Sequence, residues 1–310
     1  MVEDNEIKAQ VSPFAIREGE IKTFDGKDGY VSMNQIVHKI NIGHITDIHF
    51  AILDLVNEFE FITSRQIYQM LEIKGIDPKS QDKLNNKLDA LVKSKILTRY
   101  YFTSDEGKGI YRIYCLEKMG KYLLTSKEIE CKWQPSDNTK PVPMIKKRLA
   151  GNQVLIAYLR KVKAFDSYVV KPAITAKTLG KVFKATGGSV KLTKNSKSIQ
   201  FLFEVFRREL DWQKKLVEKM NLYKDFYENF QPGDSGFAGL PQLILVCEDE
   251  KHMAECFKEI VTNKVEIPQI KLLFTTDLRQ NKETLDETLV EFKLVDGKYK
   301  MENVELKLLG

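Results

Sequence analysis

The chain has 310 residues, of which 43% are hydrophobic and 30% are charged, and its formal net charge is +6. This length allows two domains with separate cores, and the composition is that of a globular protein rather than a disordered one. No apolar run reaches the ~18 residues that a membrane-spanning helix needs, and the amino terminus lacks the basic and apolar segments of a signal peptide. We therefore expect a protein of the cytoplasm of a bacterium or a similar cell, with no membrane span.

The four cysteines are spaced too far apart in sequence to form a close metal-binding pair. Cys115 and Cys247 fall inside apolar runs that are typical of strands, and Cys131 and Cys256 lie elsewhere. A reduced and buried thiol is the ordinary state of a cysteine in such a run. The sequence therefore predicts reduced cysteines and neither a metal nor another cofactor.

Residues 45–130 predict a winged helix-turn-helix domain, preceded by an N-terminal arm over residues 1–44. Apolar residues at helical spacing indicate a first helix over residues 47–56. Thr63 or Ser64 can cap a short second helix that ends at Leu71, since a hydroxyl accepts from the free N–H groups of a first turn.

A third helix begins at Lys79 or Ser80 and is followed by a hairpin. The β-rich runs 96–102 and 109–116, joined by the polar residues 103–108, have the pattern of two paired strands. Three helices followed by a basic hairpin form the unit that places one helix in a major groove and a wing on the phosphates. The apolar face of the third helix consists of Leu84, Leu88, Leu91 and Val92.

The polar face of the third helix and the hairpin carry the candidate DNA contacts, because Asn and Lys side chains suit base edges and phosphates. These candidates are Ser80, Gln81, Lys83, Asn86, Lys87, Arg99, Lys108 and Arg112. Asp82 and Asp89 on the same helix would repel phosphate. The alternative is that this domain docks onto another protein and that these positions are simply solvated.

Residues 131–144 contain three prolines and predict an interdomain linker, after which residues 145–310 form the second domain. From Met144 to Ser198 the chain has thirteen Lys and Arg residues but one acid, Asp166, whereas the rest of the chain has more acids than bases. Such segregation indicates a phosphate-binding surface, and the alternative is a solvated lysine-rich face. Lys146, Lys147 and Arg148 at the start of this block are therefore further candidates for DNA contact.

The second domain alternates strands and helices, which predicts an α/β sheet covered by helices and an α+β organisation of the whole chain. Its expected helices are 145–162, 211–230 and 250–261, its expected strands are 167–174, 189–193, 199–206, 241–247 and 270–276, and a terminal hairpin is expected over 290–309.

The second domain also carries part of the pattern of a PD-(D/E)xK nuclease, in which clustered carboxylates hold a divalent metal. Glu204 fits a metal ligand, but Ala173 follows Pro172 where an Asp is needed, and Phe206 stands where a Lys is needed. A lone carboxylate holds Mg²⁺ poorly. We expect a nuclease-like scaffold without nuclease activity, and for Tyr223 we favour core packing over a role as a nicking nucleophile.

Several short motifs resemble the plasmid replication-relaxation family of Gram-positive bacteria and their mobile elements. The resemblance runs over residues 45–276 and is carried by residues 63–67, 86–97, 111–116, 120–124, 203–207, 219–223 and 240–246. It implies a DNA-binding amino-terminal half and a link to plasmid replication and DNA relaxation. The family pattern has an acidic residue where this chain has Ala173, which argues against an inherited cleavage activity.

Together these patterns predict a double-stranded DNA-binding accessory protein of plasmid or mobile-element replication, relaxation or transfer (conjugation). Relaxosome or replication proteins are its expected protein partners, and a homodimer is one expected assembly. Two alternatives stay open at this point: a metal-dependent nuclease or nickase that uses Glu204, and a winged-helix transcriptional regulator.

Overall fold

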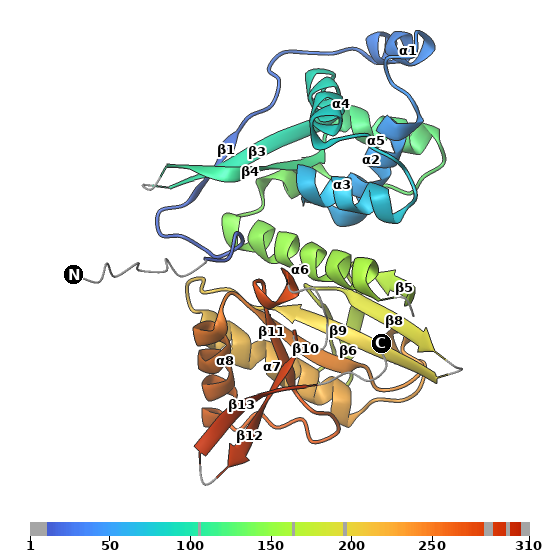
Figure 1. Cartoon of the computed structure of the whole chain (residues 1–310). Helices are drawn as coiled ribbons and strands as arrows, with labels where there is room; N and C mark the ends of the chain where they lie inside the picture. Colours follow the sequence, from blue (N-terminus) through green and yellow to red (C-terminus); the bar gives the residue numbers. More distant parts are fainter. Residues whose placement is uncertain are drawn as a thin grey trace, which may run out of the picture.

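A computed structural model describes residues 11–104, 107–162, 165–194, 197–281, 288–295 and 298–304. Helix α6 (Val142–Lys161) runs between a group of N-terminal helices and a large β-sheet (Figure 1). Among the described residues, no helix is both long enough and apolar enough to cross a bilayer.

The N-terminal half contains the expected three helices and hairpin, with further elements before and after them. Its helices are α1 (Met33–Asn41), α2 (Asp47–Phe59), α3 (Ser64–Ile73), α4 (Gln81–Lys93) and α5 (Lys118–Ser126). Its strands are β1 (Ile21–Phe24), β2 (Ile62–Thr63), β3 (Leu97–Ser104) and β4 (Gly107–Leu116), in the sheet order β1-β3-β4-β2.

Side-chain caps fix where helices α3 and α4 begin. The Thr63 side chain accepts from the Gln66 N–H at 3.2 Å, and the Gln66 side chain accepts from the Thr63 N–H at 3.2 Å. Ser80 accepts from the Lys83 N–H at 3.2 Å. Of the two expected starts of α4, Ser80 is the correct one, because Lys79 has a φ of 69°, which is incompatible with a right-handed helix.

The C-terminal half is a seven-stranded mixed sheet in the order β13-β12-β11-β10-β9-β8-β5. The strands are β5 (Phe165–Val169), β8 (Ser189–Lys194), β9 (Lys197–Val205), β10 (Gln242–Cys247), β11 (Leu273–Thr276), β12 (Val290–Val295) and β13 (Lys298–Asn303). Strands β9, β10 and β11 are parallel, and the other pairs are antiparallel. The mixed α/β class predicted from the sequence is confirmed.

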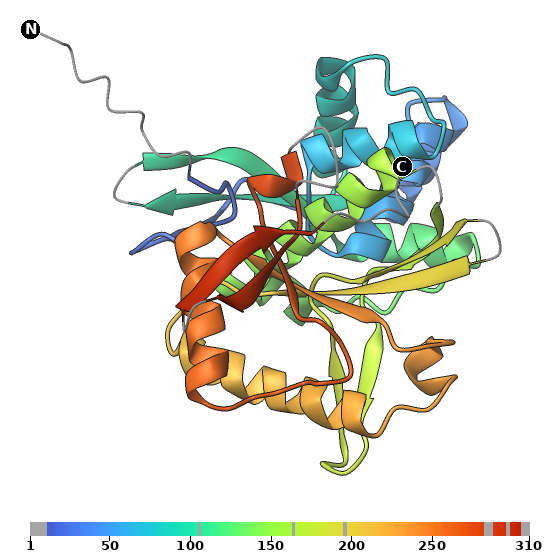
Figure 2. The same ribbon diagram turned by 60° about the horizontal axis from the view of Figure 1, so that its bottom comes forward.

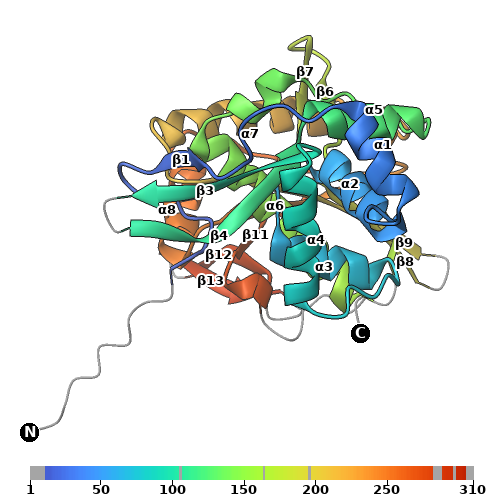
Figure 3. The same cartoon turned by 90° about the horizontal axis from the view of Figure 1, so that it is seen from above.

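One predicted strand, residues 167–174, is divided in two. Pro172 lacks an N–H group for strand pairing, and β5 ends before it at Val169. The chain then forms a separate hairpin from β6 (Ala173–Ala176) and β7 (Lys181–Lys184), which projects from the body of the protein (Figures 2 and 3). The sequence analysis did not predict β7.

Helix α6 covers one face of the large sheet, while α7 (Trp212–Glu228) and α8 (Glu250–Thr262) cover the other. One continuous apolar core joins the N-terminal helices, α6 and the inner face of the sheet, for example through Phe59, Leu149 and Phe203. Twelve of the twenty residues of α6 are buried, so the helix has almost no solvent-facing side. The division of the chain into two separately folding domains stays a prediction.

The predicted linker is ordered and packs on its neighbours. It contains the short 3₁₀ helix Pro135–Thr139, and α6 begins at Val142, earlier than expected. The buried Asn138 amide donates to the Leu116 carbonyl at 2.8 Å and accepts from the Trp133 indole N–H at 3.1 Å. These bonds fix the position of the segment that enters α6.

The N-terminal arm lies between the hairpin and the large sheet and is held by polar contacts to both. The Tyr111 hydroxyl donates to the Pro13 carbonyl at 3.0 Å, and the Ser12 hydroxyl donates to the Asp277 carboxylate. Arg207 Nη2 donates to both carboxylate oxygens of Asp277, at 2.8 and 2.9 Å. The Arg207 and Asp277 side chains are 0% and 4% exposed, so this is a buried ion pair.

We expect Gly151→Ala to lower the free energy of unfolding by about 1–2 kcal/mol, because α6 touches the chain before β8 at this glycine. A Cβ there would lie 2.5 Å from the Thr186 carbonyl oxygen and 2.8 Å from the Gly187 Cα. That overpacking costs more than the gain in helix propensity of about 1 kcal/mol. Urea denaturation measures the effect, with Gly239→Ala as the control because no atom lies within 4 Å of its added Cβ. A more stable Gly151→Ala protein would contradict this packing.

We expect Asp277→Ala to lower the free energy of unfolding by about 3–5 kcal/mol, because it leaves the Arg207 guanidinium buried without its counter-ion. The matched control is Asp28→Ala, at an exposed carboxylate, which should change stability by less than about 0.5 kcal/mol. Both values come from urea denaturation followed by circular dichroism. Equal effects of the two substitutions would show that Arg207 does not depend on Asp277.

Candidate nucleic-acid interface

Helix α4 lies on the side of the N-terminal elements that is away from the large sheet (Figure 1). The candidate DNA contacts lie on its polar face. Lys83 and Asn86 are exposed and Lys87 is half-buried, and within the described parts of the chain their side chains have no hydrogen-bond or ion-pair partner. Ser80 caps the helix, and the half-buried Gln81 donates to the Asn85 side chain at 3.1 Å. The helix thus offers three uncommitted polar side chains on one surface.

The arginines of the hairpin are already ion-paired. Asp25 of the N-terminal arm lies 3.0 Å from Arg99 Nε and 2.7 Å from Arg112 Nε, and Arg99 also pairs with Asp89. The Arg99 side chain is only 18% exposed, whereas Arg112 is 46% exposed. Arg99 is therefore not the free phosphate contact that the sequence predicted, and the side chain of Lys108 lies outside the described residues.

Two of the three candidates on α6, Lys146 and Arg148, are buried, so neither presents a free charge on the surface, and their contact with DNA stays a prediction. Lys146 pairs with Glu20 and donates to the Ala15 carbonyl, and its side chain is 2% exposed. Arg148 donates to the Val170 carbonyl at 3.1 Å, and burial lowers the pKa of its guanidinium to about 10. Lys147 is partly exposed and pairs with Glu209.

Several residues of the basic block 144–198 are neutralised in the folded protein. Acids from other segments form the pairs Lys177–Asp234 at 2.6 Å and Lys147–Glu209, and Asp166, the one acid of the block, pairs with Lys191 at 2.9 Å. Counting charges along the sequence cannot detect partners such as Asp234, which is distant in the chain.

The Glu204 carboxylate lies inside the C-terminal half and is fully engaged. Thr186 Oγ1 donates to it at 2.7 Å, the Tyr223 hydroxyl donates at 2.6 Å, and Lys219 Nζ lies 3.5 Å away. Burial, followed by the Glu204 charge, raises the pKa of Tyr223 well above its usual value, so the phenol remains protonated in the core. Within the described residues, the partners of Glu204 include no second carboxylate to complete an oxygen site for a divalent cation.

The structure brings together three potential metal ligands that were not predicted as a group from the sequence. Donor atoms of Cys247, His252 and Cys256 lie within 4.8 Å of one another, and all three residues are buried. His252 and Cys256 are one helical turn apart on α8, which was the available sequence signal. Burial raises the pKa of Cys256 well above its usual value and lowers that of His252 to about 3, so the Cys256 thiol and the His252 imidazole are neutral in this packing.

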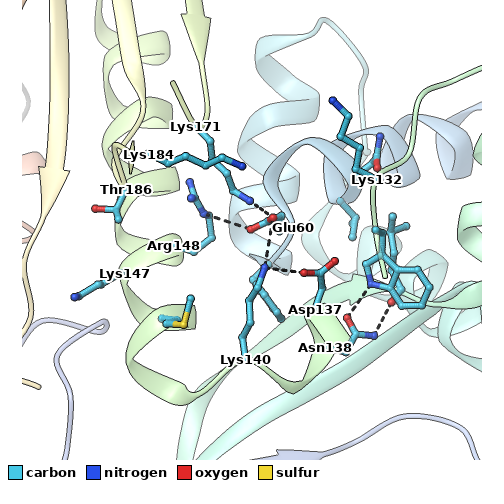
Figure 4. A pocket seen from close by; sticks show the side chains of 16 residues that line it. Glu60, Lys132, Asp137, Asn138, Lys140, Lys147, Arg148, Lys171, Lys184 and Thr186 are labelled. Atoms are coloured by element: carbon cyan, nitrogen blue, oxygen red, sulfur yellow. Dashed lines mark hydrogen bonds and ion pairs between the residues drawn. The ribbon is translucent and has the colours of Figure 1, made fainter. Parts of the chain in front are cut away.

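A pocket of about 480 Å³ lies where the turn after α2, the linker, the start of α6 and the base of the β6–β7 hairpin meet (Figure 4). We call it the Glu60 pocket. Two carboxylates, Glu60 and Asp137, and two aromatic side chains, Phe61 and Trp133, line it. Its basic residues are Lys132, Lys140, Lys147, Arg148, Lys171 and Lys184.

Glu60 lies at the centre of these cations (Figure 4). Its carboxylate pairs with Lys171 on one side, and it lies 3.8 Å from Arg148 Nε and 3.6 Å from Lys140 Nζ. Burial, and then the nearby Lys184, lower the pKa of Lys171 to about 8. Glu130 and Glu209 outside the pocket pair with Lys132 and Lys147, which leaves four basic residues facing the two carboxylates of the pocket.

The backbone at Glu60 is strained. Its φ and ψ are 65° and −61°, and the Phe61 N–H donates to the Phe59 carbonyl at 2.8 Å, which makes a tight γ-turn. Non-glycine residues rarely adopt this conformation, which costs of order 1–3 kcal/mol. The buried Asn152 amide donates to the Phe61 carbonyl at 2.7 Å and helps to hold the turn in place.

Comparison with known proteins gives one clear match. No curated protein matches the sequence significantly. Among solved structures, the restriction endonuclease FokI aligns with 75% of this chain at 9% identity and a TM-score of 0.25, and the alignment spans 42% of FokI. A TM-score this low supports neither a shared fold nor a shared activity. The family model for replication-relaxation proteins matches residues 53–240, which is more than half of the chain. The chain therefore belongs to the replication-relaxation family.

Proposed function

We propose that the protein binds double-stranded DNA through helix α4, as an accessory protein in the replication, relaxation or transfer of a plasmid or mobile element. Membership of the replication-relaxation family supports the biological role. The observation that supports DNA binding is the exposed face of α4, where Lys83, Asn86 and Lys87 have no partner in the described structure. Relaxosome or replication proteins are the protein partners that we expect.

The arrangement around α4 favours a winged helix-turn-helix. Helices α2, α3 and α4 are followed by the β3–β4 hairpin, and β2 pairs with β4 beside it. In such a unit the third helix enters the major groove and the hairpin contacts the backbone. Lysine then contacts phosphate or guanine, and asparagine can read adenine with two hydrogen bonds.

Asp25 of the N-terminal arm reduces the charge that the hairpin can offer to DNA. Together with Asp89 it neutralises Arg99 and Arg112 of the hairpin, so the wing contributes less charge than its sequence implies. Affinity for DNA would then depend on α4 more than on the hairpin arginines. A transcriptional regulator would use the same α4 surface, and the role in replication or relaxation rests on the family alone.

We expect Lys83→Gln and Lys87→Gln each to weaken binding to duplex DNA and to reduce the salt dependence of the affinity. Loss of one phosphate contact lowers the slope of log K against log salt by about 0.9. Fluorescence anisotropy between 50 and 200 mM salt measures the slope, and Lys258→Gln on the exposed side of α8 is the matched control. The proposal fails if the wild-type affinity does not depend on salt, or if the control weakens binding equally.

We expect supercoiled plasmid to stay intact when it is incubated with the protein and Mg²⁺ or Mn²⁺. Glu204 is saturated by Thr186, Tyr223 and Lys219, which leaves a poor set of ligands for a divalent cation. Agarose gel electrophoresis reports nicking. Nicking that both Glu204→Gln and Glu204→Ala abolish would instead establish a metal-dependent nuclease.

A further inference from the structure

The Glu60 pocket has the composition of an anion site. Of the six basic residues that line it, Lys132 and Lys147 pair with Glu130 and Glu209 outside the pocket. The other four face two carboxylates, so an additional anion would reduce the repulsion among them. Lys171 and Lys140 are 22% and 25% exposed, which places their ammonium groups where a ligand can reach them while water screening is reduced. The first turn of α6, which also borders the pocket, has no acidic residue.

The Glu60 carboxylate occupies the position where such an anion would bind. It accepts ion pairs from the start of α6, from the linker and from the segment before β6, through Arg148, Lys140 and Lys171. It is held there by a strained γ-turn rather than by a regular helix end. Departure of this carboxylate would leave Lys171 and Arg148 without the counter-ion that they share, whereas Lys140 would keep its pair with Asp137 at 3.0 Å.

We propose that the Glu60 pocket binds a phosphate group of DNA, which displaces the Glu60 carboxylate from its cations. Arg and Lys groups that converge on one point form charge-assisted hydrogen bonds with phosphate oxygens. That the phosphate comes from DNA rests on the proposed function, whereas the phosphate site itself rests only on the pocket.

The other end of the pocket fits the nucleoside attached to such a phosphate. The Trp133 ring lines it and is fixed by its hydrogen bond to Asn138, which is itself anchored to the Leu116 carbonyl. Aromatic rings stack on bases of any sequence. The volume of about 480 Å³ accommodates one nucleotide, so the pocket accepts an unpaired nucleotide or a strand end rather than a duplex.

Isothermal titration of the full chain tests this site at constant ionic strength and without phosphate buffer. The probes are inorganic phosphate, dTMP, and a short thymidine oligonucleotide with and without a 5′-phosphate. We expect Lys171→Gln to weaken binding of the oligonucleotide about tenfold, because it removes a charge-assisted contact. We expect Glu60→Gln to strengthen binding about tenfold, because no carboxylate then competes with the phosphate.

Two matched controls separate the pocket from general charge effects. Lys191→Gln removes a lysine that pairs with Asp166 outside the pocket, as Lys171 pairs with Glu60 inside it, and Glu58→Gln removes a carboxylate that pairs with Lys74 at 3.6 Å. Both variants should bind as the wild type does. The phosphate site is refuted if no probe binds to the wild type or to Glu60→Gln, or if Lys171→Gln binds without loss.

The probes also identify the source of the phosphate. Tighter binding of the oligonucleotide than of dTMP or inorganic phosphate supports DNA, and the reverse order rules DNA out as the natural ligand. The α4 variants Lys83→Gln and Lys87→Gln should bind the short single strand normally. A wild-type protein that binds these probes but no duplex would remove the proposed function of α4 and leave the phosphate site standing.

Discussion

The burial of helix α6 on all sides is the constraint on which the rest of this structure depends. Its apolar residues pack against the N-terminal helices and against one face of the sheet, in a single core. Most positions on a helix enclosed in this way have no access to water, although Arg160 near its end remains exposed. Lys146 and Arg148 are therefore buried, and each requires a partner because an isolated charge in an apolar interior is very costly.

Pairing these charges organises the surrounding segments. Lys146 pairs with Glu20 and so holds the N-terminal arm against α6. Ser12 of the same arm donates to Asp277, which forms the buried ion pair with Arg207 in the C-terminal half. Arg148 lies at the other side of the same helix and contributes to the Glu60 pocket. The buried charges of one helix thus fix both the course of the N-terminal arm and the geometry of a basic pocket.

The two candidate surfaces differ in how their charge is held. On α4, Lys83 and Asn86 extend into solvent without partners in the described structure, which suits a surface that adjusts to a duplex. In the Glu60 pocket the cations are confined around a carboxylate on a strained turn, which suits a single phosphate group. Glu204, which stands where a nuclease would have a metal ligand, belongs to neither surface. Its carboxylate already accepts from Thr186 and Tyr223 and pairs with Lys219.

Residues that are near one another in the chain were enough to predict most of the helices and strands and the family, and they narrowed two helix caps to Thr63 or Ser64 and to Lys79 or Ser80. Which charges are free depends instead on contacts between distant segments. Asp25, Glu60 and Glu20 neutralise basic residues far away in sequence, and no periodicity or local charge count records such pairs. The block of lysines that looked like one surface is divided because folding places an acid from another segment beside each of several members, and electrostatic energy depends on distance in space rather than along the chain.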